Sequence, residues 1–153
     1  MNDAKIDLIT GNIVVNGVSI APLTLDEFLR ITIQHNIKFK KNIPNEGWSN
    51  FGLGVTINNQ DFGLNISYSK NELYSTWFSW AGGISEKKGY DTTEKELIAD
   101  KNSLSKFLTK IIGKEPEEKE YNHNIFLFEW GNISVAASLQ SAMVSMGVTW
   151  HRD

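Results

Sequence analysis

The stretch from Phe51 to Trp80 constrains the fold of this chain more than any other part of the sequence. Apolar residues alternate with small or polar ones over 51–57 and again over 62–68, and polar residues 58–61 separate the two runs. A period of two in consecutive runs, with a polar turn between them, predicts a β-hairpin with one buried face. Residues 74–80 add a third run, rich in aromatic side chains. This stretch therefore predicts the middle of a β-sheet.

Both ends of the chain predict further strands. Asn16-Gly17 lies between two short apolar runs, and this dipeptide readily takes the positive φ angles of a type I′ hairpin turn. Near the other end, alternation predicts strands over 125–130 and 133–139, joined by a turn at Gly131-Asn132. A last strand should place Val144, Met146, Val148 and Trp150 on one face.

Two helices are expected between these strands. Thr24 and Glu27 fit a capping box at the start of a helix that should end near His35. Residues 103–113 give the clearest helix, because apolar residues recur at i, i+3, i+4, i+7 and i+8 and Gly113 stands where a left-handed residue is wanted. Thr93 and Glu96 also fit a helix cap. The predicted fold class is α+β: a curved antiparallel β-sheet (meander) with two main helices packed on it, forming one domain over residues 1–153.

Composition argues against several kinds of functional site. The chain has no cysteine, which removes disulfides, thiolate metal sites and cysteine nucleophiles. His35, His123 and His151 are far apart and have no metal-ligand spacing, so no metal and no cofactor are expected. No GxSxG nucleophile elbow is present. We therefore expect a protein without catalytic residues, not an enzyme.

Charge and hydropathy limit the partners. The net charge is −3, whereas a protein that binds nucleic acid through phosphates should carry a basic excess, so no nucleic-acid partner is expected. No apolar run approaches the roughly 20 residues of a membrane helix, and the N-terminus does not have the pattern of a signal peptide. The sequence therefore predicts a soluble, cytoplasmic protein without a membrane partner.

Two features predict residues that bind a protein partner. Glu115, Glu117, Glu118 and Glu120 against Lys119 carry the equivalent of the whole chain's net charge, in a segment interpreted as an exposed loop. This segment is either a solvated loop that helps solubility or a rim that attracts a basic protein. Trp48, in a predicted loop over 42–50 with Pro44, either plugs the core or anchors a partner. Tyr74 and Trp80 join the predicted contacts because aromatic residues dominate binding hot spots.

Three segments together resemble small bacterial immunity proteins, which are encoded beside polymorphic toxins, including those of contact-dependent growth inhibition systems. The helix 104–113 before an acidic, proline-containing loop is similar to their second helix. The sequence departs from them over 138–145, which is almost uncharged. The other two segments are the opening Ile6-Asp7-Leu8, Thr10-Gly11, Asn16-Gly17, Ile20, Thr24-Leu25 and Glu27, and the closing Phe128-Glu129-Trp130-Gly131-Asn132-Ile133.

The resemblance implies a cytoplasmic, non-catalytic protein that binds the C-terminal toxin domain of its cognate effector and covers its active site. A nuclease is one toxin type that needs such an inhibitor. The residues predicted to contact the toxin come from their placement in the chain and are not transferred from the family. The identity of the toxin and the oligomeric state are not predicted. Two alternatives remain: a β-rich domain whose segments 51–80 and 126–150 line a small-ligand cavity, and a sheet that binds single-stranded nucleic acid.

Overall fold

The structure is a computed structural model that describes residues 2–42 and 46–151. The chain divides into two compact units, a first unit of residues 1–77 and a second unit of residues 78–153. Both contain mainly antiparallel strands together with α-helices, so the predicted α+β class is confirmed. The single domain over 1–153 stays a prediction. In the described part of the chain, no helix has the length and apolar character needed to cross a membrane.

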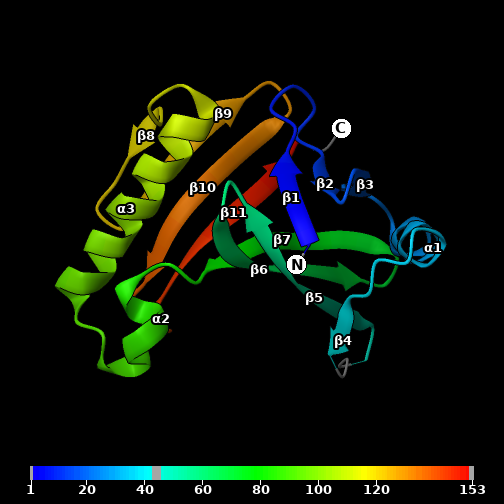
Figure 1. The fold of residues 1–153 in the computed structure, drawn as a ribbon, viewed down its shortest axis with the longest axis horizontal. Helices are drawn as coiled ribbons and strands as arrows, with labels where there is room; N and C mark the ends of the chain where they lie inside the picture. The colour runs from blue at the N-terminus through cyan, green and yellow to red at the C-terminus, as the bar shows by residue number, and fades with distance from the viewer. Residues whose placement is uncertain (1, 43–45, 152–153) are drawn as a thin grey trace. The chain divides into compact units, whose positions relative to one another are not determined.

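The first unit is built on a sheet with the strand order β3-β2-β1-β5-β6-β7, and β4 pairs with β5 outside this path (Figure 1). Most pairs are antiparallel as predicted, but β1 runs parallel to β5. A parallel pair needs a crossover connection, and α1 (Leu25–Gln34) lies in the chain between the two strands. The strands are β1 (Asn2–Ile6), β2 (Ile13–Val15), β3 (Val18–Ala21), β4 (Lys40–Asn42), β5 (Trp48–Ile57), β6 (Gln60–Ser69) and β7 (Glu72–Trp80), the last three residues of which belong to the second unit.

The hairpin of β5 and β6 confirms the central prediction. Ile57 pairs with Gln60, which leaves a two-residue turn of Asn58 and Asn59 with φ angles of 45° and 66°. These positive angles are those of a type I′ turn, whose twist matches the strands that it joins. The buried face carries the predicted residues, including Phe51, Val55, Ile57, Phe62, Leu64, Ile66 and Tyr68.

Helix α1 packs on this hairpin through one aromatic side chain. Thr24 and Glu27 form the predicted capping box, and the helix ends at the C-cap residue His35. Phe28 is almost fully buried, and its ring lies 4.9 Å from the ring of Phe51 and 5.5 Å from that of Tyr68, between centroids. Edge and tilted ring pairs of this kind add to the energy of area burial. They fix α1 against the buried face of β5 and β6.

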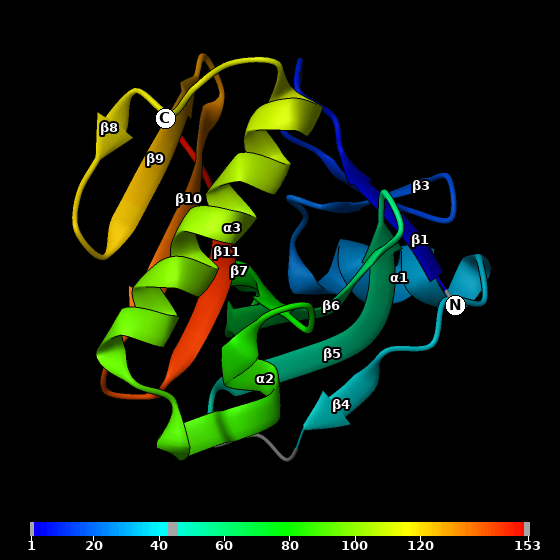
Figure 2. The same ribbon diagram turned by 60° about the vertical axis from the view of Figure 1, so that its left-hand side comes forward.

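The second unit is a four-stranded antiparallel sheet, in the order β11-β10-β9-β8, with helices beside it. Helix α3 runs along this sheet and contacts β10 and β11, burying Leu97, Leu104 and Leu108 (Figures 1 and 2). The elements are α2 (Ile84–Lys88), η1 (Gly89–Asp91), α3 (Glu94–Ile112), β8 (Glu118–Lys119), β9 (His123–Phe128), β10 (Gly131–Ser138) and β11 (Met143–Trp150).

Helix α3 is much longer than the predicted helix over 103–113. It begins at Glu94, with Thr93 and Glu96 forming a complete capping box, and Gly113 takes the predicted left-handed conformation with φ of 84°. The apolar stripe stops at residue 104 because the buried face of the first half carries Asp100 and Lys101. With these two polar residues in buried positions, the apolar pattern predicts only the second half of the helix.

The predicted turn at Gly131-Asn132 is wrong. Gly131 pairs with Phe128 in β9 and with Trp150 in β11, so the turn consists of Glu129 and Trp130. A Cβ atom at position 131 would overlap the backbone carbonyl oxygen of Thr149. The glycine is needed for a close approach of two strands, with φ of 155°, and not for the turn itself.

Candidate functional site

In the first unit, the structure brings together two of the predicted contact residues. The rings of Trp48 and Tyr74 meet edge to face, with centroids 4.8 Å apart and planes at 89°. Tyr74 is 62% exposed, and Trp48 is half-buried at the start of β5, not in a loop as predicted. Of the predicted loop over 42–50, Asn42 belongs to β4 and residues 48–50 belong to β5, and Pro44 lies outside the described residues. The edge-to-face contact with Trp48 limits the orientations open to the exposed Tyr74 ring.

The aromatic pair lies at one end of a mostly uncharged sheet face. Trp48 shares this face with the other alternate residues of β5, and cross-strand pairing adds the facing residues of β6. Most are half-exposed, and all are small or polar apart from Trp48 and the charged Asp61 at the far end. The cross-strand pairs on this face are Trp48 with Ser69, Asn50 with Ser67, Gly52 with Asn65, Gly54 with Gly63, and Thr56 with Asp61. We call this set the open face.

The third predicted aromatic contact, Trp80, is the last residue of β7 and is half-buried in the second unit. A different aromatic pair in that unit was not predicted as a contact. The rings of Phe128 and Trp130 stack with centroids 4.9 Å apart and planes at 9°, and the Lys114 ammonium lies 4.5 Å from the centre of the Phe128 ring. The sequence signal was the pair of aromatic residues on either side of Glu129.

The acidic segment 115–120 is partly an edge strand and not simply a loop, because Glu118 and Lys119 form β8 and pair with β9. Glu117 forms an ion pair with Lys114, and its other oxygen accepts the backbone N–H of Leu127 at 2.7 Å. The hydrogen bond from Lys114, helped by the Leu127 N–H, holds the pKa of the Glu117 carboxyl below its usual range. Glu117 is therefore already engaged within the protein.

The other three glutamates differ in whether their carboxylates already have a partner within the protein. Glu115 lies 3.4 Å from Lys119 in an exposed ion pair. Glu118 and Glu120 are exposed, and their carboxylates form no hydrogen bond or ion pair with any other residue that the structure describes. Of the four predicted glutamates, these two are the ones available to a positively charged partner.

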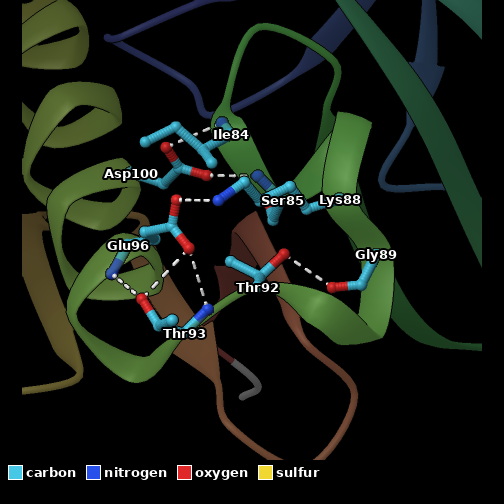
Figure 3. Close-up of polar contacts among 8 residues, drawn as sticks. All are labelled: Ile84, Ser85, Lys88, Gly89, Thr92, Thr93, Glu96 and Asp100. Carbon is cyan, nitrogen blue, oxygen red and sulfur yellow. Dashed lines mark hydrogen bonds and ion pairs between the residues drawn. The ribbon is translucent and has the colours of Figure 1, made fainter.

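A polar cluster, of which Asp100 is the buried member, holds α2 against α3 (Figure 3). Asp100, on α3, is 3% exposed and accepts the backbone N–H groups of Ile84 and Ser85, each at 2.9 Å. Lys88 donates to Glu96 at 2.7 Å, and this bond, with those from the helix cap, lowers the pKa of the Glu96 carboxyl. The carboxylates of this cluster have protein partners, which indicates a structural role. Within 2–42 and 46–151, no group of three or more acidic or histidine residues could hold a metal ion.

The first unit also has an apolar cleft of about 490 Å³ beside the C-terminal half of α1. Phe28, Phe39 and Phe51 line it together with Ile33, whose side chain is 77% exposed. The cleft has room for an apolar group, and the segment 36–39 forms one of its walls.

Comparison with protein-family models, with curated proteins and with solved structures finds no match to this chain.

Proposed function

We propose that this protein is an immunity protein that binds the toxin domain of a cognate polymorphic effector and neutralises it by covering its active site. The proposal starts from the three segments that resemble such proteins. The structural observation that supports it best is the edge-to-face pair of Trp48 and Tyr74 beside the open face.

The physical argument rests on where binding energy concentrates. A few aromatic residues in the centre of an interface carry most of the energy, and weaker contacts around them keep water out. Tyr74 is more than half exposed, and its contact with the Trp48 ring limits the orientations open to it. Little conformational entropy is then lost when a partner covers the ring. The half-exposed Ser67 and Asn50 of the open face supply uncharged hydrogen-bonding groups beside it.

The carboxylates of Glu118 and Glu120 support a basic partner. They lie on and just after the short strand β8, at the end of the strand order in the second unit. Exposed charges of this kind raise the association rate with an oppositely charged protein more than they raise affinity. A toxin domain that binds nucleic acid carries the basic surface that they would attract.

The test is binding of the purified full chain to the purified C-terminal domain encoded by the neighbouring upstream reading frame. We expect a one-to-one complex in which Tyr74→Ala weakens binding by about tenfold or more, as hot-spot truncations do. Tyr90→Ala is the matched control, because Tyr90 is 85% exposed on the short helix η1. No complex with the wild-type chain, or equal losses in the two variants, would contradict the proposal.

The apolar cleft favours a second candidate, a domain that binds a small apolar ligand. Its walls include Phe28, Phe39 and Ile37, whose side chains give little polar specificity but would bury an aliphatic or aromatic group. Native mass spectrometry of the purified protein would reveal a retained apolar ligand. A tight protein complex free of ligand would favour the immunity proposal.

A further inference from the structure

A polar groove of about 520 Å³ opens in the second unit between α3 and the chain that leads into β9. Lys101 and Ser105, which are one helical turn apart on α3, form one wall. Asn124 of β9 meets Ser105, and Glu115 and Lys119 also line the groove. The groove lies within the second unit, and neither Trp48 nor Tyr74 lines it.

Three polar side chains that line the groove are more than nine-tenths buried. Lys101 is 4%, Ser105 is 5% and Asn124 is 6% exposed. Burial of a polar group is unfavourable unless a hydrogen-bond partner replaces the lost water. The Asn124 amide nitrogen donates to the Ser105 hydroxyl oxygen at 2.9 Å, but the Asn124 side-chain oxygen is buried and has no partner. The site thus has one acceptor that lacks a donor.

The groove also has a buried positive charge without a counter-charge. The Lys101 ammonium donates to the backbone carbonyl oxygen of Glu120 at 2.9 Å, and no carboxylate of a described residue forms an ion pair with it. Burial, with a smaller effect of the Lys119 charge, lowers the pKa of the Lys101 ammonium. Lysine is almost never buried to this degree unless its charge is paired. An anion beside Lys101 would supply the missing pair.

The other charges around the groove also favour an anion as the ligand. Glu115 and Lys119 pair with each other at 3.4 Å, so their charges largely cancel. Lys106, which is exposed at the mouth of the groove, forms no ion pair with another described residue. Lys101 and Lys106 therefore give this groove a positive charge in a chain whose net charge is −3.

We propose that this groove binds a small hydroxylated anion. Its phosphate or carboxylate group lies beside Lys101 and Lys106, and the Ser105 hydroxyl donates to it. When the ligand binds, the Asn124 side chain turns its buried oxygen toward the groove, and a hydroxyl of the ligand donates to it. The groove shares Glu115 with the acidic segment, but a small anion can be tested on the purified chain without any toxin, so the result does not depend on the immunity proposal.

The groove is larger than a bound water molecule requires. One water molecule occupies about 30 Å³ in the liquid, so the volume accommodates a ligand of several heavy atoms together with some solvent. Water molecules in the groove would leave the charge of Lys101 without a counter-ion. This difference separates an anion site from a hydrated groove.

The test is isothermal titration calorimetry of the full chain at constant ionic strength with three probes. Glycerol 3-phosphate and glycerate both carry hydroxyl donors and differ in the anionic group, so the pair distinguishes a phosphate from a carboxylate site. Inorganic phosphate tests whether the alcohol hydroxyls of the ligand contribute. We expect saturable binding of at least one of the hydroxylated probes, tighter than that of inorganic phosphate.

Variants make the test specific. Lys106→Gln and Lys101→Met should each weaken binding of the successful probe by about tenfold or more, the usual loss for one charged hydrogen bond. Lys110→Gln is the control, because Lys110 is exposed on the same helix and does not line the groove. Lys106 is exposed, so its variant decides the matter even if Lys101→Met does not fold. No saturable binding of any probe, or equal binding by Lys106→Gln and Lys110→Gln, would overturn the proposal.

Discussion

One carboxylate oxygen of Glu117 accepts the backbone N–H of Leu127 at 2.7 Å and so ties the acidic segment to strand β9. The other oxygen pairs with Lys114, whose ammonium also lies over the ring of Phe128. Glu117, which has the most contacts within the protein of the four predicted glutamates, therefore stabilises the fold. The carboxylates of Glu118 and Glu120 remain available to contact a partner.

Glu117→Ala should lower the free energy of unfolding by about 1 kcal/mol, because a charge-assisted hydrogen bond is lost at a partly exposed site. Glu118→Ala is the matched control, since the Glu118 carboxylate has no partner among the described residues, and it should leave stability nearly unchanged. Urea unfolding followed by tryptophan fluorescence measures both. Equal effects of the two substitutions would show that the bond to Leu127 contributes nothing.

The same carboxylate predicts part of the acid sensitivity. The pKa of Glu117 is lower in the folded protein than its ordinary value of 4.5, with Lys114 as the main facing charge. Its contribution to stability is therefore complete above pH 4.5 and is lost as the pH falls through the lowered pKa. Glu117→Gln should flatten the fall in stability below pH 4.5. A pH series of unfolding curves in which both proteins fall equally would contradict this.

Asp100→Asn should lower the free energy of unfolding by about 2 kcal/mol, because the amide can accept only one of the two N–H groups of Ile84 and Ser85. The exposed Asp91→Asn serves as the control. Hydrogen exchange at the amides of residues 84 and 85 gives the local readout, and it should speed up in Asp100→Asn alone. Unchanged exchange would mean that Asp100 does not hold the start of α2.

Gly131→Ala should lower the free energy of unfolding by about 3 kcal/mol. The new Cβ atom would overlap the carbonyl oxygen of Thr149, which is a backbone atom of β11 and can move only if that strand moves. Gly54→Ala is the control in another strand, because nothing lies within 4 Å of its Cβ position. Thermal unfolding measures both variants. A stable Gly131→Ala protein would show that β10 and β11 can separate at this point.

Much of this fold could be predicted because local patterns and tertiary packing agree. The alternation over 51–57 and 62–68 matches the two faces of β5 and β6, and Asn58-Asn59 matches the turn. The parallel pairing of β1 with β5 joins strands more than 40 residues apart in the chain, and no local pattern specifies it. The cap formed by Thr93 and Glu96 was predicted. The apolar pattern did not join this cap to the helix over 103–113, because Asp100 and Lys101 occupy buried positions where the pattern requires hydrophobic residues.

The candidate sites could be predicted less well. The exposure of the acidic segment can be predicted from its charge. The hydrogen bond of Glu117 to Leu127 depends on the pairing of β8 with β9, which no sequence pattern predicts. The polar groove depends on Asn124 meeting Ser105 across 19 positions of the chain. Its only sequence signal is the helical spacing of Lys101 and Ser105, which is common on exposed helix faces as well.

The charge of the acidic segment predicts how a toxin domain would associate. Glu118→Gln with Glu120→Gln should slow association with the toxin domain and weaken its dependence on salt, with a smaller effect on dissociation. The control is Glu86→Gln with Asp91→Asn, which removes the same charge from exposed positions on α2 and η1. Stopped-flow measurements at several salt concentrations test this. The charge argument fails if neutralising all four glutamates, 115, 117, 118 and 120, leaves the association rate and its salt dependence unchanged.

The most direct test of the immunity proposal is growth of cells that express the toxin domain encoded by the neighbouring upstream reading frame. Co-expression of this chain should restore growth, and Tyr74→Ala should restore it less well than Tyr90→Ala at equal protein levels. Failure of the wild-type chain to restore growth, together with the absence of a complex between the two purified proteins, would contradict the proposal.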